Sequence, residues 1–214
     1  MKLLNSFNIV FLMDNTYKTN KYWLPLLEIV GVTSTRLTFS VAFAFLSNEK
    51  QNNFTWALER LRGLFMTSKG GPQVIVTDRD LALMNVVGTV FPECYHLLCR
   101  FHIQKYVQAK CKMLVNSIDA WDVVLQAWEN VMDCEDKLKF NDCVNRLELV
   151  CQSWPVLFEY VNDSWIIPYN KYFVKAWTNK VMHLGNTTSN RYVCILLLIH
   201  FFINGLYDSM YKLY

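Results

Sequence analysis

The fold of this chain is decided by two apolar runs that each lead to an aspartate: Asn8-Ile-Val-Phe-Leu-Met-Asp14 and Val74-Ile-Val-Thr-Asp78. Short β-rich runs of this kind are typical of buried strands in a sheet that is covered on both faces. In such sheets the ligand crevice lies just beyond the strand ends. Two carboxylates brought together there would offer the hard oxygen ligands that a two-metal phosphoryl-transfer site needs. The alternative is that each aspartate only caps the next turn or helix.

The pattern of the first hundred residues predicts an α/β sheet. Three β-rich runs come first, followed by a segment with apolar residues at helical spacing, and then by a strand, a helix and a strand. The predicted strands are residues 8–14, 26–33, 37–45, 73–77 and 95–98, and the predicted helices are residues 48–65 and 81–90. Asp78 or Asp80 is placed to cap the second of these helices. Periodicity alone does not give the order of the strands.

Five motifs in this region are specific when they occur together. They are Asp14-Asn-Thr-Tyr-Lys-Thr-Asn-Lys-Tyr22, Pro25-Leu-Leu-Glu-Ile-Val-Gly-Val-Thr33, Phe54-Thr-Trp-Ala-Leu-Glu-Arg-Leu61, Thr77-Asp-Arg-Asp-Leu-Ala-Leu-Met84 and Leu98-Cys-Arg-Phe-His-Ile-Gln-Lys105. The series resembles the transposase domain of Mutator-like elements (MULEs). It is equally similar to the plant transcription factors of the far-red-impaired-response family, which descend from such transposases. The resemblance covers about residues 3 to 191.

This resemblance implies a ribonuclease-H-like fold, with a mixed sheet flanked by helices in which the first and fourth strands are neighbours. Asp14 and Asp78 would then be the first two acids of a DDE triad, both catalytic and both metal ligands. The implied cofactor is Mg²⁺ or Mn²⁺, which activates water or a 3′-hydroxyl for attack on a DNA phosphodiester. Asp80, which follows closely, is interpreted as a helix cap or a partner of Arg79.

Cys99 and His102 form a further candidate pair. A Cys-x-x-His sequence is half of a zinc site, but strand alternation places Cys94 and His96 on the opposite face from Cys99, so a second pair is missing. The pair resembles the Cys-x-x-His motif that MULE-type transposases carry after the second aspartate. There it would serve for positioning or DNA contact. The alternative is simple burial of both residues.

From residue 103 to about 164 the apolar residues repeat at helical spacing throughout. We therefore expect an α-helical insertion after the fifth strand that packs outside the sheet. The resemblance places such helices between the fifth strand and the last catalytic acid. Since no internal repeat or low-complexity linker interrupts the chain, we expect one MULE domain over residues 1–191.

The composition is that of a globular intracellular protein. Its 214 residues are 53% hydrophobic and can bury a sizeable core. The 7 cysteines include no CxxC pair, and no secretory signal precedes them, which favours reduced thiols. Lys and Arg number 21 against 18 Asp and Glu, so any DNA-binding surface must be a local patch.

Basic and aromatic residues interleave in two places. The first group is Arg100, Lys105, Lys110 and Lys112, and the second is Tyr169, Lys171, Tyr172, Lys175, Trp177 and Lys180. Cations beside aromatic rings suit nucleic-acid backbones and unpaired bases. A solvated helix face is the more common explanation of such groups.

The C-terminal part departs from the family pattern. The segment from His183 to Arg191 matches the one that leads into the helix bearing the catalytic glutamate, which is expected about two residues after Arg191. Val193 stands there instead, and no carboxylate follows until Asp208. Glu28 and Glu49 belong to earlier elements, and Glu159 and Asp163 to the helical insertion, so each would need the fold to bring it in. A site with two of three carboxylates should be severely impaired in strand cleavage.

Residues 192–214 form a divergent hydrophobic tail. Its apolar run, Val193–Ile203, is much shorter than the roughly 20 residues that a membrane-spanning helix needs, so we do not expect a membrane anchor. The tail is open to interpretation as a helix that closes against the sheet, as a short membrane segment, or as sequence read through an unspliced intron or a shifted frame.

We therefore expect a MULE transposase domain that is truncated at both ends, of DNA-transposition ancestry, and catalytically defective. The alternative is a non-enzymatic transcription regulator of the far-red-impaired-response type. Both imply DNA as the partner and the nucleus as the location. The sequence leaves open whether the chain is a mobile-element relic or a domesticated regulator, which DNA it targets, and whether it forms homo- or hetero-oligomers.

Overall fold

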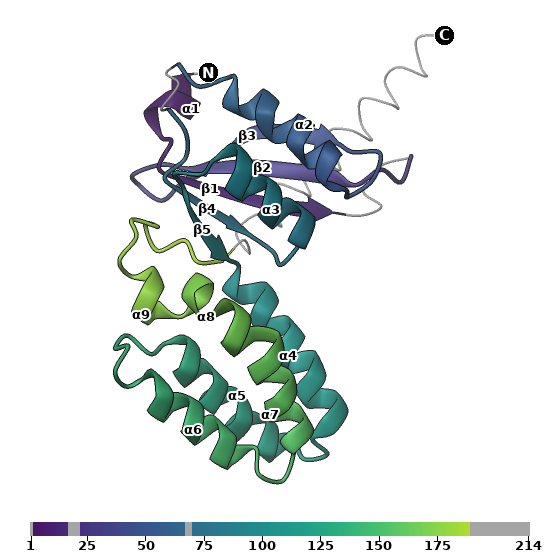
Figure 1. The fold of residues 1–214 in the computed structure, drawn as a ribbon, viewed down its shortest axis with the longest axis vertical. Helices are drawn as coiled ribbons and strands as arrows, with labels where there is room; N and C mark the ends of the chain where they lie inside the picture. The colour runs from purple at the N-terminus through teal and green to yellow at the C-terminus, as the bar shows by residue number, and fades with distance from the viewer. Residues whose placement is uncertain (1, 17–21, 67–69, 189–214) are drawn as a thin grey trace. The chain divides into compact units, whose positions relative to one another are not determined.

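The structure, a computed structural model, describes residues 2–16, 22–66 and 70–188 (Figure 1). They form two compact units, one that reaches His96 and one that spans Leu97–Thr187. The single domain expected over residues 1–191 stays a prediction, and the divergent tail at 192–214 lies outside the described residues.

The N-terminal unit is built on a five-stranded mixed sheet with the order β3-β2-β1-β4-β5. The strands are β1 (Val10–Thr16), β2 (Leu26–Val32), β3 (Thr38–Phe45), β4 (Val74–Thr77) and β5 (Tyr95–Leu98). β2 runs antiparallel to both β1 and β3, whereas β4 runs parallel to β1. Three antiparallel strands joined to a parallel fourth strand beside the first are the ribonuclease-H-like arrangement, so the predicted fold class is confirmed.

Two helices cover one face of this sheet. α2 (Gln51–Arg62) and α3 (Leu81–Val90) lie side by side over the strands, and the short α1 (Lys2–Ser6) precedes β1 (Figure 1). The core beneath them takes alternate strand residues together with apolar helix residues, among them Phe11, Met13, Ile29, Ile75, Phe54, Leu58 and Val87. Because side chains alternate across a strand, Leu12, Asp14 and Glu28 project from the opposite face of the sheet.

The first strand differs from its predicted limits. It covers Val10–Thr16 rather than residues 8–14, because antiparallel pairing with β2 continues as far as Thr16 and Leu26. Asp14 therefore lies inside β1 and not at its end. The parallel ladder between β1 and β4 ends with the pair Met13 and Thr77. Asp14 is therefore the first residue of β1 beyond that ladder.

The two longer helices of this unit begin in different ways: α3 has a side-chain cap, whereas α2 follows a hydrogen-bonded turn. α3 begins as predicted, since Asp80 Oδ1 accepts a hydrogen bond of 2.9 Å from the Leu83 amide. α2 begins three residues later than predicted, after a turn in which the Asn53 side chain donates to Ser47 Oγ and to the Asn48 carbonyl, both at 2.9 Å.

The second unit is helical, as predicted for the insertion. Its elements are α4 (Arg100–Leu114), α5 (Ile118–Met132), α6 (Phe140–Val150), α7 (Pro155–Val161), the π-helical η1 (Asn162–Ile166), α8 (Ile167–Phe173) and α9 (Lys175–Thr178). The helices begin at Arg100 and extend to Thr178, beyond the predicted 103–164. Trp128, Trp165 and Phe173 are fully buried, and the rings of Trp128 and Phe173 lie 5.8 Å apart.

The same described residues contain no helix that is both long and apolar enough to cross a membrane. The cysteines among them form no disulfide.

Candidate active site

Asp14 and Asp78 follow neighbouring positions on two parallel strands. Met13 and Thr77 are partners in the β1–β4 ladder, and the two aspartates come directly after them. Adjacent strands lie about 4.8 Å apart, and both aspartates are half-buried. The expectation that β1 and β4 are adjacent and parallel is confirmed by this pairing, with Asp78 one residue beyond the end of β4. The role of the two aspartates as catalytic residues and metal ligands stays a prediction.

Asp78 is fixed by a short chain of hydrogen bonds from β5. Thr77 Oγ1 donates to the Asp78 carbonyl at 2.7 Å and lies 2.8 Å from His96 Nε2. Because a hydroxyl has one proton, His96 must donate to Thr77 through Nε2–H. Burial lowers the pKa of His96 to about 4, so near pH 7 the ring is neutral and carries its proton on Nε2. The Asp78 carboxylate also accepts from the Arg79 amide at 2.7 Å.

Glu28 is a further acid near Asp14, and it belongs to β2. The β1–β2 register places it directly opposite Asp14, and its side chain is only 2% exposed. Desolvation, and then the charge of Asp14, raise the pKa of Glu28 to about 7. Neither of its carboxylate oxygens has a hydrogen-bond partner within the described part of the chain. The signal that could have found it is a charged residue within the apolar run Leu26–Val32.

The donor chemistry of this face suits a hard divalent cation. Asp14 and Glu28 offer carboxylate oxygens, the ligands that Mg²⁺ and Mn²⁺ prefer, and the Glu28 oxygens are buried without a partner. Within the described ranges, however, no three His, Cys, Asp or Glu side chains already form a group that could hold a metal ion. The face therefore fits a cation held by one or two carboxylates with water in its other coordination positions.

Cys99 and His102 lie at the start of the helical unit. Cys99 is the N-cap residue of α4 and is 1% exposed. His102 is half-buried, and its ring lies 5.5 Å from that of Phe101. Cys99 is therefore a buried residue, as the simple alternative expects, and His102 is buried only in part. A role of either residue in positioning or DNA contact stays a prediction.

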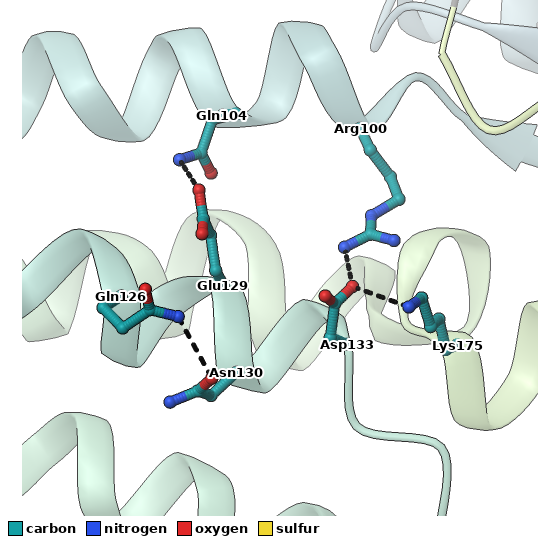
Figure 2. A network of polar contacts seen from close by, with 7 residues as sticks. All are labelled: Arg100, Gln104, Gln126, Glu129, Asn130, Asp133 and Lys175. Carbon is teal, nitrogen blue, oxygen red and sulfur yellow. Dashed lines mark hydrogen bonds and ion pairs between the residues drawn. The ribbon is translucent and has the colours of Figure 1, made fainter.

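Part of the predicted basic surface is used within the helical unit. Figure 2 shows Arg100 of α4 and Lys175 of α9 both pairing with Asp133, which ends α5. Burial alone would raise the pKa of Asp133, but the two cations outweigh it and lower that pKa. The Gln104 side chain of α4 donates a hydrogen bond of 3.2 Å to the Glu129 carboxylate of α5 (Figure 2). Arg100 and Lys175 therefore hold helices together.

The lysines of the first basic group lie over aromatic rings of their own unit. Lys105 is 5.3 Å from the ring centre of Phe101, Lys110 is 5.3 Å from that of Tyr160, and Lys112 is 5.8 Å from that of Trp121. Such contacts favour the interpretation of this group as a solvated helix face. On such a face the lysine stem covers an aromatic ring while the ammonium group stays in water.

The second basic group contains a lysine cluster that sequence spacing did not reveal in full. Lys137, Lys171 and Lys180 are exposed, Lys137 Nζ lies 5.4 Å from the ring centre of Trp177, and the charges of the other two lysines act on Lys137. Partial desolvation, and then the charges of Lys180 and Lys171, lower the pKa of Lys137. No carboxylate among the described residues forms an ion pair with any of the three. We call Lys137, Lys171, Lys180 and Trp177 the lysine cluster.

The comparison with known families decides the identity of the sheet unit. The family described as "MULE transposase domain" matches residues 10–106. This segment carries a MULE transposase domain. The MULE domain begins at β1 and continues into α4, so it contains both candidate aspartates, Glu28 and the Cys99–His102 pair.

The MULE domain and the helices after it are distantly homologous to plant proteins. FAR-RED IMPAIRED RESPONSE 1 of Arabidopsis thaliana is 25% identical over 197 residues, which are 87% of this chain and 22% of that protein. FAR1-RELATED SEQUENCE 5 of the same plant is 33% identical over 97 residues, 45% of this chain and 12% of that protein. The chain thus spans less than a quarter of the length of these relatives.

A fungal protein also contains a similar segment. The "PKS-NRPS hybrid synthetase cheA" of Chaetomium globosum is 36% identical over 104 residues, 47% of this chain and 2% of that protein. Among solved structures, the trimeric HTLV-2 integrase catalytic core domain in complex with magnesium aligns with a TM-score of 0.30 and 15% identity, over 59% of this chain and 85% of that one. The assignment of a ribonuclease-H-like fold depends on the strand order β3-β2-β1-β4-β5 and not on this alignment.

Proposed function

We propose that this chain is a DDE-type MULE transposase domain that binds DNA but does not cleave or join it by itself. The observation that supports the proposal is the parallel pairing of β1 and β4 inside the MULE match, since Asp14 and Asp78 each come directly after the last pair of that ladder. In this family the acids at these positions serve DNA strand transfer. The glutamate expected near residue 193 is replaced by Val193.

Asp14 and Asp78 are the residues that would hold Mg²⁺ or Mn²⁺. When bound, such an ion polarises a phosphodiester and lowers the pKa of a coordinated water. The chain's own contribution is positioning: the His96–Thr77 hydrogen bond supports the backbone at Asp78. Strand cleavage in a two-metal site needs enough carboxylates for both ions. With valine in the third position, we expect binding without turnover.

The lysine cluster supplies the DNA contact in this proposal. The charges of Lys180 and Lys171 act on Lys137, so an approaching phosphate would relieve this repulsion, and Trp177 offers a stacking face. Arg100 and Lys175 are engaged with Asp133 and are not assigned this role. The overall excess of 3 positive charges is small, so the proposal depends on this local patch.

A second candidate function is a nuclear transcription regulator of the far-red-impaired-response type. The alignment with FAR-RED IMPAIRED RESPONSE 1 favours it, because its 197 residues extend well beyond the 10–106 MULE match into the helical unit. A regulator needs DNA or protein contact and no strand cleavage, so a missing catalytic acid would not harm it.

Binding of labelled duplex DNA, followed by fluorescence anisotropy between 50 and 200 mM salt, tests the shared part of both candidates. We expect binding that weakens steeply with salt and needs no divalent cation. Failure to bind DNA at low salt would contradict both. A reporter-gene assay in plant cell nuclei separates them, because only a regulator changes transcription from a promoter that it binds.

A further inference from the structure

Glu28 is an ionisable residue within a strand that is otherwise apolar and buried. All seven residues of β2 are buried, and Glu28 is the sole acid among them. Its side chain is 2% exposed, and both carboxylate oxygens lack hydrogen-bond partners among the described residues. Buried polar groups are normally satisfied, so an orphaned carboxylate needs an explanation.

The nearest charge makes the position of Glu28 less favourable still. Asp14 is its direct partner in the antiparallel ladder, so both carboxylates project from the same face of the sheet. Burial of Glu28, and then the negative charge of Asp14, both disfavour the ionised form of the Glu28 carboxylate. Like charges directly opposite each other destabilise a strand pair. On the other side of Asp14, β4 brings Asp78, another acid.

Three things could balance the charge of Glu28: a basic side chain, a proton or a bound cation. No lysine or arginine among the described residues forms an ion pair with it. A proton would neutralise the carboxylate but would leave both of its oxygens without a hydrogen-bond partner among the described residues. Further orphaned atoms, the Asn15 amide and Thr16 Oγ1, follow Asp14 on β1. Since the described residues supply no partner, a cation with its own water shell is the partner that fits these oxygens.

We propose that Glu28 and Asp14 together bind one divalent cation of the Mg²⁺ or Mn²⁺ class. Mg²⁺ is commonly held by one or two carboxylates while it keeps several waters, so two acids suffice for a single ion. The proposal rests on the proposed function in one respect, the assignment of Asp14 as a metal ligand. It adds Glu28, from β2, as a further ligand on the other side of Asp14 from Asp78. A single ion held here neutralises the acidic pair without completing a two-metal cleavage site.

The test is Mn²⁺ binding by the purified 214-residue chain at pH 8, measured by isothermal titration calorimetry. Glu28→Gln keeps the shape of the side chain and removes its charge, and Asp14→Asn does the same across the ladder. Exposed Glu93→Gln is the matched control. We expect the wild-type chain and Glu93→Gln to bind Mn²⁺ equally, and Glu28→Gln and Asp14→Asn each to bind at least about tenfold more weakly. Equal affinity in Glu28→Gln, or no binding by the wild-type chain, would overturn the proposal.

A second measurement does not depend on calorimetric heat. Because a ligand that binds only the folded state stabilises it by mass action, Mn²⁺ should raise the melting temperature of the wild-type chain and of Glu93→Gln but not of Glu28→Gln. An equal rise in all three would overturn the proposal. DNA binding by the lysine cluster is measured separately. Its loss would contradict the proposed function while leaving the Mn²⁺ result intact.

Discussion

Asp14 on β1 and Glu28 on β2 are direct cross-strand partners, and the second of them is almost completely buried. Two acids in this relationship weaken the fold that holds them unless a proton or a cation lies between them. Proteins keep unfavourable arrangements of this kind mainly at functional sites. The pair therefore links the stability of the sheet to the chemistry of the candidate site.

Glu28→Gln should stabilise the metal-free protein at pH 8 by up to about 3 kcal/mol. Folding raises the Glu28 pKa from 4.5 to about 7, so the folded state binds this proton more tightly than the unfolded state does. The contribution of Glu28 to stability thus falls as the pH rises through this range, and glutamine avoids the loss. Urea unfolding at pH 8 and pH 4 measures it. A gain that is equal at both pH values would contradict the stated cause.

His96 should give the opposite pH dependence. Its pKa falls from 6.5 in the unfolded chain to about 4 in the folded one, so the unfolded state binds more protons between these values. Stability should therefore drop as the pH is lowered from 6.5 to 4, by about 2–3 kcal/mol after a discount for the solvent that the ring still contacts. In His96→Gln this part of the pH dependence should be absent. Denaturant unfolding across the same pH range, compared with the wild-type chain, decides it.

Gly31→Ala should destabilise the sheet by about 1–3 kcal/mol. Gly31 on β2 faces Phe39 on β3, and a methyl group added to Gly31 would collide with the Phe39 ring. Gly88→Ala is the matched control, because nothing lies within 4 Å of a methyl group at that helical position. It should stabilise α3 by about 0.5–1 kcal/mol. Thermal unfolding of the two variants should shift in opposite directions. A shift in the same direction would contradict the packing described for Phe39.

Neutralising one residue of the lysine cluster should weaken DNA binding and reduce the salt slope by about 1. Lys137→Gln, Lys171→Gln and Lys180→Gln each remove one proposed phosphate contact. Lys50→Gln, an exposed change in the sheet unit, removes the same charge as a control. Anisotropy titrations at several salt concentrations give the slopes. Slopes that are equal in all four variants would assign DNA binding to a different surface.

The sheet was predictable from sequence because its strands are apolar on both faces and its helices are amphipathic. The limits of β1 were not, since Thr16 belongs to the strand only through its pairing with Leu26. The helical unit was recognised from its spacing, yet its extension to Thr178 involves α9, whose four residues are too few to show a period.

The candidate site was predictable only in part. Asp14 and Asp78 stand at the ends of apolar runs and match family motifs, which makes them visible in sequence. Glu28 could not be assigned to the site from sequence, because pairing register, and not proximity along the chain, brings it to Asp14. Lys137 joins Lys171 and Lys180 from a loop more than thirty residues earlier in the chain, so interleaving along the sequence could not include it.

The most direct test of the central claim is a strand-cleavage assay with supercoiled plasmid DNA in Mg²⁺ and in Mn²⁺. Wild-type chain and Asp14→Ala are compared at equal concentration, under salt conditions in which both bind the DNA. We predict no nicking above background by either protein, because Val193 stands where the family glutamate is expected and one cation at Asp14 and Glu28 does not make a two-metal site. Metal-dependent nicking by the wild-type chain that disappears in Asp14→Ala would contradict the account, because a complete catalytic site would then be present.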